Sequence, residues 1–252
     1  MDLNLKGKNV LVTGSTSGIG YEIARGFYKE GSNLFLNGRD KQKLKSAEAK
    51  LPGSLSCDAD VSDPKEAKRL IKLVKSKWNK IDIVVCNVGS GKSVPPSEEK
   101  FMDWQKSFSI NLWSTTNVVE NLIEDLSQSN GIIICISSIC GNELIPGAPI
   151  TYSCAKAALN HYIKTISWPL AQKGIRINGI SPGNILFEGS TWDEKYKSKR
   201  VSVESYIKNN VALNRFGMTK EISSFACYLG SENSNFTTGS IFTIDGGQTR
   251  SY

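Results

Sequence analysis

The sequence predicts an α/β fold, a single doubly wound domain in which a parallel sheet of about seven strands carries helices on both faces. The first observation behind this prediction is that short apolar runs and helical patterns alternate from one end of the chain to the other. The second is that the apolar runs are β-rich and apolar on both faces, as buried parallel strands are. The third is size, because 252 residues of which 39% are hydrophobic suit one large domain with its own core.

Seven runs are expected to form the strands. The strong ones are Asn9–Thr13, Asn33–Leu36, Ile81–Cys86, Gly131–Ile136, Ile175–Ile180 and Ser240–Ile244, and a weaker one is Ser54–Cys57. Helical patterns lie between them, at Ile19–Glu30, Lys41–Lys50, Pro64–Trp78, Asp103–Leu126, Tyr152–Lys173 and Glu221–Leu229. Connections between parallel strands are right-handed, and this order therefore winds helices onto both faces of the sheet.

Two features interrupt the regular pattern. The stretch Gly183–Asn210 is polar, charged and aromatic, and we expect an irregular segment that acts as a substrate lid at residues 183–210. Pro169 falls inside a helical pattern, where its ring removes a backbone donor, and we expect it to kink that helix or end it early. Residues 1–252 are otherwise assigned to one domain.

Composition excludes several classes of protein. No run of about 18 apolar residues is present, so no membrane span is expected. The stretch Met1–Lys8 is polar and lacks the apolar core of a secretory signal, which makes a cytoplasmic location the simplest expectation. Six cysteines without a CxxC pair and a single histidine, His161, offer little to a metal, and we expect no metal site and free thiols. The net charge of +7 comes without a nucleic-acid-binding motif, so no nucleic-acid partner is expected.

A glycine-rich loop follows the first strand and precedes the first helix. In this loop Gly14 permits a tight turn, Gly18 lets the backbone approach a pyrophosphate, and Gly20 lets the helix pack near the sheet. The start of the helix also presents free N–H groups to an anion. A plain glycine turn is the alternative, but this position favours a dinucleotide site in a Rossmann-type fold. The residues expected to hold the cofactor here are Gly14, Ser15, Thr16, Ser17, Gly18, Ile19 and Gly20.

The end of the second strand selects the cofactor. An acidic residue there would bind the ribose 2′-hydroxyl of NAD, but the position falls on Gly38, and Arg39 follows it. A guanidinium binds the 2′-phosphate of NADP through charge-assisted hydrogen bonds, so we expect NADP(H) rather than NAD(H). Arg39 as an ordinary surface cation is the alternative, and Asp40 would compete if the register were shifted.

A tyrosine and a lysine lie one helical turn apart. The spacing of Tyr152 and Lys156 places both on one face of a helix. A nearby ammonium favours the phenolate and is expected to lower the pKa of the tyrosine, so that it can exchange a proton with a carbonyl or alcohol oxygen as hydride moves. Ser138 follows a strand and should lie at the carboxyl edge of the sheet, where its hydroxyl can donate to a substrate carbonyl, with Ser137 as competitor.

The loop Thr13-Gly14-Ser15-Thr16-Ser17-Gly18-Ile19-Gly20 resembles the TGxxxGIG motif of the short-chain dehydrogenase/reductase family. The resemblance spans essentially the whole chain: further matches are Asn87-Val88-Gly89, the catalytic set Asn111, Ser138, Tyr152 and Lys156, Pro182-Gly183, and Asp245-Gly246-Gly247. Two departures stand out. Ser138 precedes Tyr152 by one residue more than the family pattern, which the loop Asn142–Ile150 is expected to absorb. Phe187 stands where the family often has a threonine that touches the nicotinamide carboxamide.

The resemblance implies roles for individual residues. Asn111 would disturb its helix and anchor a relay water behind Lys156, which would tune Tyr152 and hold the ribose. The remaining cofactor contacts implied by the family are Asp60 and Val61 at the adenine, Asn87 and Gly89 at a strand end, and Pro182, Gly183 and Ile185 near the nicotinamide.

The predicted function is that of a carbonyl reductase similar to the 3-oxoacyl-[acyl-carrier-protein] reductases, with a small-molecule carbonyl or alcohol substrate. The family also implies a homo-oligomer, a tetramer or a dimer. Two alternatives stay open. A non-catalytic dinucleotide-binding sensor would normally have lost Tyr152 or Lys156, and both are present. A sugar or nucleotide-sugar oxidoreductase or epimerase of the extended type would carry a different glycine spacing and a larger C-terminal domain.

Overall fold

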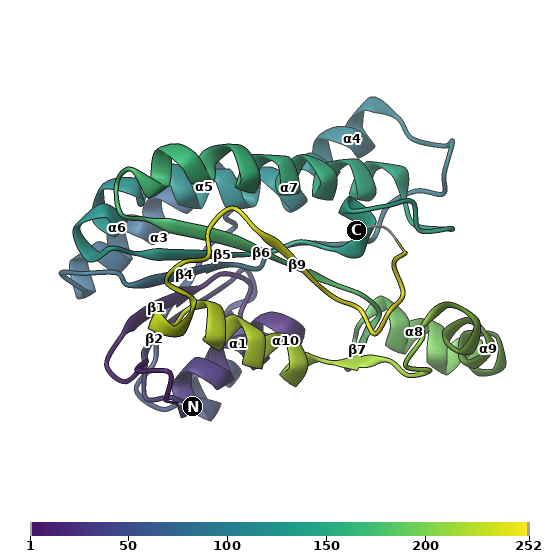
Figure 1. Ribbon diagram of the computed structural model, residues 1–252, viewed down its shortest axis with the longest axis horizontal. Helices are drawn as coiled ribbons and strands as arrows, with labels where there is room; N and C mark the ends of the chain where they lie inside the picture. Colours follow the sequence, from purple (N-terminus) through teal and green to yellow (C-terminus); the bar gives the residue numbers. More distant parts are fainter. Residues whose placement is uncertain (1, 251–252) are drawn as a thin grey trace.

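The computed structural model describes residues 2–250 and contains a seven-stranded parallel sheet (Figure 1). Its strand order is β3-β2-β1-β4-β5-β6-β9, and every neighbouring pair is parallel. The strands are β1 (Asn9–Val12), β2 (Asn33–Gly38), β3 (Leu55–Asp58), β4 (Ile83–Cys86), β5 (Ile132–Ile136), β6 (Arg176–Pro182) and β9 (Ile241–Ile244). The predicted doubly wound fold is confirmed, and all seven predicted strands lie within two residues of their expected ends.

Helices cover both faces of the sheet. One face carries α1 (Gly18–Lys29), α2 (Lys41–Lys50) and α10 (Thr219–Leu229). The other carries α3 (Pro64–Lys77), α5 (Ser114–Glu120), α6 (Ile123–Ser129) and α7 (Ile150–Ala171), with α4 (Phe101–Phe108) against the end of α7 (Figure 1). Two short 3-10 turns, η2 (Ile139–Gly141) and η3 (Glu232–Ser234), also occur.

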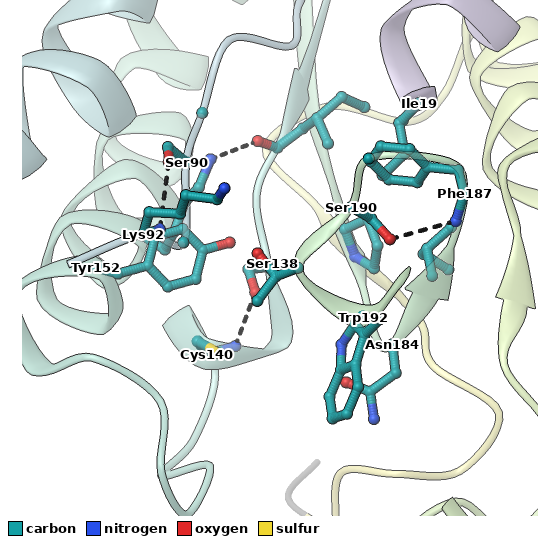
Figure 2. A pocket seen from close by; sticks show the side chains of 18 of the residues that line it. Ile19, Ser90, Lys92, Ser138, Cys140, Tyr152, Asn184, Phe187, Ser190 and Trp192 are labelled. Atoms are coloured by element: carbon teal, nitrogen blue, oxygen red, sulfur yellow. Dashed lines mark hydrogen bonds between the residues drawn. The ribbon is translucent and has the colours of Figure 1, made fainter. Parts of the chain in front are cut away.

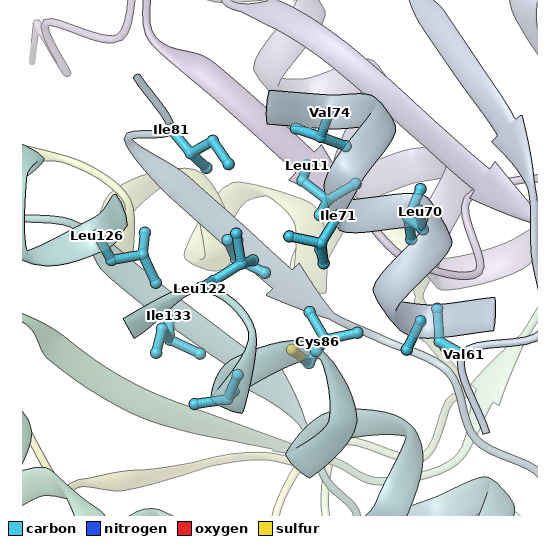
Figure 3. Packing of buried hydrophobic residues seen from close by; sticks show 14 of the residues in the cluster. Leu11, Val61, Leu70, Ile71, Val74, Ile81, Cys86, Leu122, Leu126 and Ile133 are labelled. Atoms are coloured by element: carbon cyan, nitrogen blue, oxygen red, sulfur yellow. The ribbon is translucent and has the colours of Figure 1, made fainter. Parts of the chain in front are cut away.

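Strand periodicity divides the core into two layers. On β1, Val10 and Val12 pack in the layer beneath α1 and α10, whereas Leu11 packs in the layer beneath α3 and α5. Successive strand side chains point to opposite faces, which is why the central strands must be apolar at every position. Figure 3 shows the second layer, where Leu70 of α3 and Ile133 of β5 meet in the same cluster.

The predicted helix Asp103–Leu126 is not a single α-helix. It consists of α4, the π-helical turn η1 (Ser109–Trp113), α5 and the start of α6, with a break at Leu122. A π-helical turn adds one residue to the helix, and the apolar pattern gave no sign of this. The turn contains Asn111, the residue expected to disturb this helix.

A further expectation is corrected. Residues 183–210 are not irregular, because they contain β7 (Ile185–Leu186), α8 (Thr191–Ser198) and α9 (Arg200–Asn210). Helix α8 buries no side chain fully and so has no apolar stripe to detect. The unforeseen β7 pairs with β8 (Gly217–Met218) in a separate two-stranded sheet.

Pro169 lies in the last turn of α7. The helix ends at Ala171, two residues after the proline and two residues before the expected end at Lys173, in line with the early end expected from a ring that removes a backbone donor.

Across residues 2–250, the structure has no helix with the combination of length and apolarity that a membrane crossing requires.

The layered core predicts where mutations destabilise the fold. Leu70→Ala removes a side chain that is 0% exposed on α3 and should lower the free energy of unfolding by about 2–5 kcal/mol, through lost burial and a residual cavity. Leu144→Ala, at a leucine that is 89% exposed, should change it by no more than about 0.5 kcal/mol. Urea denaturation followed by circular dichroism measures both variants. Equal losses would contradict this assignment of the core.

Candidate active site

A cavity of about 1120 Å³ opens at the carboxyl edge of the sheet. The strands β1 and β4 are neighbours whose following helices lie on opposite faces, and ligands bind at such a switch point in open α/β sheets. Most of the residues expected from the sequence line this one cavity, namely Gly14, Thr16, Ser17, Ile19, Gly20, Arg39, Asp60, Val61, Asn87, Gly89, Ser138, Tyr152, Lys156, Pro182, Gly183 and Ile185. Three expected residues, Ser15, Gly18 and Asn111, lie outside its lining.

Ser15 faces the protein interior. It is 0% exposed, its amide donates to the carbonyl of Asn37 at 2.8 Å, and its hydroxyl accepts from the amide of Asn37 at 2.9 Å. The side-chain amide of Asn37 in turn donates to the carbonyls of Cys57 and Ala59. Asn37 therefore joins the glycine loop to the ends of β2 and β3, a role that sequence reasoning missed because the residue looked like the polar end of a strand.

A second asparagine holds the loop from the other side. The side-chain amide of Asn87, just beyond β4, donates to the carbonyls of Thr13 and Gly14, each at 3.1 Å. Gly20 lies directly against that amide, and a Cβ there would collide with Asn87 and with the carbonyl of Gly14. The close packing expected of Gly20 is therefore packing against Asn87 as well as against the sheet.

Phe187 covers part of the glycine loop. A Cβ built on Gly18 would lie 2.5 Å from Cε2 of the Phe187 ring, and Figure 2 shows that ring beside Ile19. Gly18 has φ of +57°, so both its backbone conformation and its contact with the ring favour glycine. At this point of the cavity wall the structure places the aromatic ring, where the sequence had suggested open backbone for a pyrophosphate.

At the other end of the cavity, Arg39 is the exposed cation at the tip of β2. Its guanidinium lies 3.2 Å from a carboxylate oxygen of Asp60, and only one of its nitrogens is engaged there. Burial acts to raise the pKa of Asp60, but hydrogen bonds from Ser62 and the charge of Arg39 outweigh it, and the pKa lies below its usual value. Asp40 does not compete, because its carboxylate accepts from the amides of Gln42 and Lys43 and caps α2.

Ser138 is the serine available for chemistry. It caps η2, where its hydroxyl oxygen accepts from the amide of Cys140 at 3.2 Å, and its hydroxyl also hydrogen-bonds with Tyr152. Its competitor Ser137 donates to the side-chain oxygen of Asn160 at 2.5 Å. Gly141, three residues after Ser138, packs so closely on the backbone of Lys156 that a Cβ on it would lie 2.6 Å from the Lys156 carbonyl carbon. This contact sets η2 against α7.

Tyr152 faces Ser138 across the cavity (Figure 2), so the longer spacing between them is accommodated by the intervening loop. Burial raises the pKa of Tyr152 above its ordinary value, the nearby Cys140 adds to the rise, and a hydrogen bond with Ser138 opposes it. The lowered pKa expected from the sequence is therefore wrong for this structure, since desolvation of the phenolate outweighs any help from the lysine.

Lys156 is a buried ammonium, 2% exposed, whose Nζ donates to the carbonyl of Ile136 at 2.8 Å. Burial lowers the pKa of Lys156 to about 8, with Cys135 and Cys140 acting in the opposite direction. A Cβ on Gly89 would lie 3.1 Å both from this Nζ and from Oδ1 of Asn111, so the two side chains share the space around Gly89.

Asn111 ties the π-helical turn to the end of β4. Its side-chain oxygen accepts from the amide of Ser90 at 2.8 Å, and its side-chain nitrogen donates to the carbonyls of Ser90 and Ser107. The side chain is 1% exposed, and its donor is fully used by the protein. In this structure Asn111 therefore positions the backbone next to Lys156.

The two C-terminal motifs meet at the same edge. The amide of Gly183 donates to the carbonyl of Ile244 at 2.9 Å, and a Cβ on Gly183 would lie 2.7 Å from Cα of Asp245. The carboxylate of Asp245 accepts from the amides of Gly247 and Thr249, which closes the glycine turn after β9. Pro182-Gly183 and Asp245-Gly246-Gly247 are thus two halves of one close backbone contact.

Known proteins share this arrangement over their whole length. A family described as enoyl-(acyl carrier protein) reductase matches residues 14–249. The 3-oxoacyl-[acyl-carrier-protein] reductase of Rickettsia prowazekii is 31% identical over 247 residues, which cover 97% of this chain and 98% of the relative. The chain belongs to the short-chain dehydrogenase/reductase family.

Other relatives differ in what their names say they act on. Glucose 1-dehydrogenase 2 of Bacillus subtilis is 29% identical over 256 residues, covering 98% of this chain and 96% of the relative. The crystal structure of L-sorbose reductase from Gluconobacter frateurii, complexed with NADPH and L-sorbose, matches with a TM-score of 0.93 at 29% identity and full coverage of both chains. The predicted Rossmann-type fold and the predicted class, an NAD(P)-dependent dehydrogenase/reductase, are confirmed.

The depressed pKa of Lys156 predicts a pH dependence of stability. Between about pH 8 and 10.5 the native lysine has lost a proton that the unfolded chain still binds, so this residue makes the free energy of unfolding rise with pH. Its slope should not exceed about 1.4 kcal/mol per pH unit. Lys156→Met keeps the apolar stem and removes the titration. The free energy of unfolding of the wild type minus that of the variant, measured by denaturation without cofactor, should therefore become more positive from about pH 8 to 10.5. A constant value across this pH range would contradict the burial of the ammonium.

Proposed function

We propose that this protein is an NADPH-dependent oxidoreductase that reduces a carbonyl to a secondary alcohol, with Tyr152 as the proton donor. The observation that carries the proposal is the meeting of three groups in one cavity with the glycine loop: the hydroxyl of Ser138, the phenol of Tyr152 and the buried ammonium of Lys156. Hydride transfer to a carbonyl creates negative charge on its oxygen, and this trio can meet that charge with a hydrogen bond and a proton.

The residues present fit a phosphorylated dinucleotide. Ser17 begins α1 without a side-chain cap, so first-turn N–H groups remain available to a phosphate. At the adenosine end Arg39 has donors to spare, and the nearest acid along the chain, Asp40, is committed to capping α2. These features favour NADP(H) over NAD(H), as do the NADPH and NADP complexes among the similar structures. When bound, the cofactor supplies hydride from its nicotinamide C4.

The protein's own groups would then divide the work. Ser138 donates to the substrate oxygen and orients it, and Tyr152 gives up its proton as that oxygen gains charge. A raised pKa keeps the phenol protonated in the resting protein, which suits a donor. Lys156 holds the nicotinamide ribose and stabilises the phenolate left behind, while Asn111 positions the backbone and the relay water beside Lys156. The cofactor contacts assigned to Asp60, Val61, Asn87, Gly89, Pro182, Gly183 and Ile185 belong to this proposal too.

The alternatives fit less well. A sensor has no need for Tyr152 and Lys156 together in a cavity, and an extended epimerase typically carries a glycine spacing different from that of Gly14, Gly18 and Gly20.

Residues 183–210, whose helices α8 and α9 contribute to the cavity lining, are proposed as the substrate lid, and the cytoplasm as the location. The names of the relatives include 3-oxoacyl, glucose and sorbose enzymes, so the reaction at CH–OH/C=O is what they share.

The first test removes the acidic proton. Tyr152→Phe keeps the ring and should lower single-turnover oxidation of NADPH on a good carbonyl substrate by about 10²–10⁴-fold, while NADPH affinity measured by fluorescence stays within about threefold. Tyr162→Phe is the matched control, because it removes a phenol from the same helix outside the cavity. Turnover near the wild-type rate in Tyr152→Phe would refute the mechanism.

The second test concerns cofactor choice. Arg39→Ala should raise the KM for NADPH by about tenfold or more, since a charge-assisted contact is worth roughly 1.5–3 kcal/mol, and should leave the KM for NADH nearly unchanged. Lys41→Ala removes an exposed cation close by, which pairs with Asp58 and does not line the cavity, and should change neither. Equal losses with both cofactors in Arg39→Ala would remove the assigned role of Arg39.

The third test concerns assembly. Large apolar side chains are exposed beside the long helices, including Phe101, Met102 and Trp113 on the α4 side and Trp168 on α7. Exposed apolar surface of this kind supports the expected symmetric homo-oligomer. Light scattering at micromolar concentration should give a mass of two or four times 27.6 kDa. A mass equal to the monomer would rule the oligomer out.

A further inference from the structure

The charges that line the cavity are unevenly distributed. Beyond Lys156, the substrate side is lined by three cations, Lys92 from the loop after β4 and Lys195 and Lys199 from the lid. Among residues 2–250, the one carboxylate in the lining is that of Asp60, which lies at the adenosine end beside Arg39. The side of the cavity that must take the substrate is therefore lined by more positive than negative charge.

Three of the four acids in residues 183–210 pair with other cations, and the fourth, Glu188, is exposed and does not line the cavity. Asp193 pairs with Lys197 at 2.8 Å, and Glu204 pairs with Arg200 at 2.8 Å. Glu194 pairs with Lys92 at 2.9 Å, which links the loop after β4 to α8.

Two lid cations are left over. Within residues 2–250, neither Lys195 nor Lys199 has a carboxylate within ion-pair distance. Lys195 lies over the ring of Trp192, 4.9 Å from its centroid, and so stays close to the cavity wall.

A buried donor points to the same kind of ligand. Asn184 lines the cavity just after Pro182-Gly183, and Figure 2 shows its side chain beside Trp192. Its Nδ2 is buried and has no hydrogen-bond partner within the described chain. A buried unpaired donor is unfavourable, and a ligand oxygen that accepts from it would relieve this penalty.

The remaining wall is flat and aromatic. Trp192 and Tyr206 stack with ring centroids 5.2 Å apart and an interplanar angle of 29°, and both line the cavity. The substrate side thus offers a reacting end at Ser138 and Tyr152, an aromatic wall, and at the lid two ammonium groups together with hydroxyls such as that of Ser202. The ammonium groups only donate, so they match an oxyanion, which only accepts hydrogen bonds, better than a neutral polyol, whose hydroxyls also donate.

We propose that the substrate is an anionic carbonyl compound whose carboxylate or phosphate is held by Lys195 and Lys199, with Asn184 donating to one of its oxygens. This proposal rests on the proposed carbonyl reduction and names its substrate class. The carboxylate or phosphate of the substrate lies on the lid side of the cavity, and its carbonyl reaches Ser138 and Tyr152. The positive charge of the lid lysines attracts the anionic substrate to the cavity.

The experiment compares charged and neutral members of matched pairs. NADPH oxidation is followed with 3-oxobutanoate and 4-oxopentanoate against their methyl esters, and with dihydroxyacetone phosphate against dihydroxyacetone. The charged member of each reactive pair should have the higher kcat/KM, by about tenfold at low salt, and added NaCl should reduce that advantage. The pair with the largest ratio of kcat/KM, charged member over neutral member, shows whether the site prefers a carboxylate or a phosphate.

Variants identify the residues responsible. Lys195→Gln with Lys199→Gln should raise the KM of the charged member about three- to tenfold and leave the neutral member unchanged, in line with partly solvated ion pairs. Asn184→Asp, nearly isosteric, should reject the charged member by about tenfold or more, because it places a like charge in the pocket. Lys208→Gln, which removes a cation from α9 away from the cavity, is the control and should change neither.

The outcomes separate the two proposals. Equal kcat/KM for charged and neutral members, or equal effects of the lysine variants on both, would overturn the anionic substrate while carbonyl reduction stands. Absence of NADPH oxidation with every compound, together with a Tyr152→Phe variant no different from wild type, would overturn the proposed function and this inference with it.

Discussion

Two asparagine side-chain amides, one buried and one half-buried, hold the glycine loop in place, and the rest of the site depends on them. Asn37 ties Ser15 to the ends of β2 and β3, and Asn87 ties Thr13 and Gly14 to the end of β4. A glycine-rich segment is flexible by itself, so its shape must be imposed from outside. With both amides satisfied, the start of α1, the tip of β2 and the end of β4 keep a fixed separation, which positions the adenosine end relative to the reacting end.

At the reacting end, burial acts on two groups in opposite directions. It raises the pKa of Tyr152 and lowers the pKa of Lys156 to about 8, because desolvation disfavours the charged form of each. The lysine therefore loses its proton at a lower pH than the phenol does. In the proposed reaction a phenolate forms only as the substrate oxygen takes the proton of Tyr152, so the stabilisation that the Lys156 ammonium would give it acts late in the reaction.

The sequence predicted what local patterns encode. Apolar runs located all seven strands of the main sheet, and the motif residues fell around one cavity because parallel strands end at one edge. It could not predict what depends on distant contacts. The role of Asn37 and the sign of the pKa shift of Tyr152 both follow from neighbours far along the chain. The π-helical turn and α8 were missed because neither has an apolar period of its own.

The small ladder between β7 and β8 has a consequence for how such a protein can change. Ile185 and Leu186 pair with Gly217 and Met218, so the segment that contains α8 and α9 begins and ends at two neighbouring strands. Lengthening or shortening a segment with fixed ends changes its closure free energy only slowly, by about 0.6 kcal/mol for each doubling. Helices α8 and α9, which line the cavity, can therefore be exchanged or resized with little effect on the sheet. New substrate ranges can arise by changes in this segment while the glycine-loop part of the cavity stays the same.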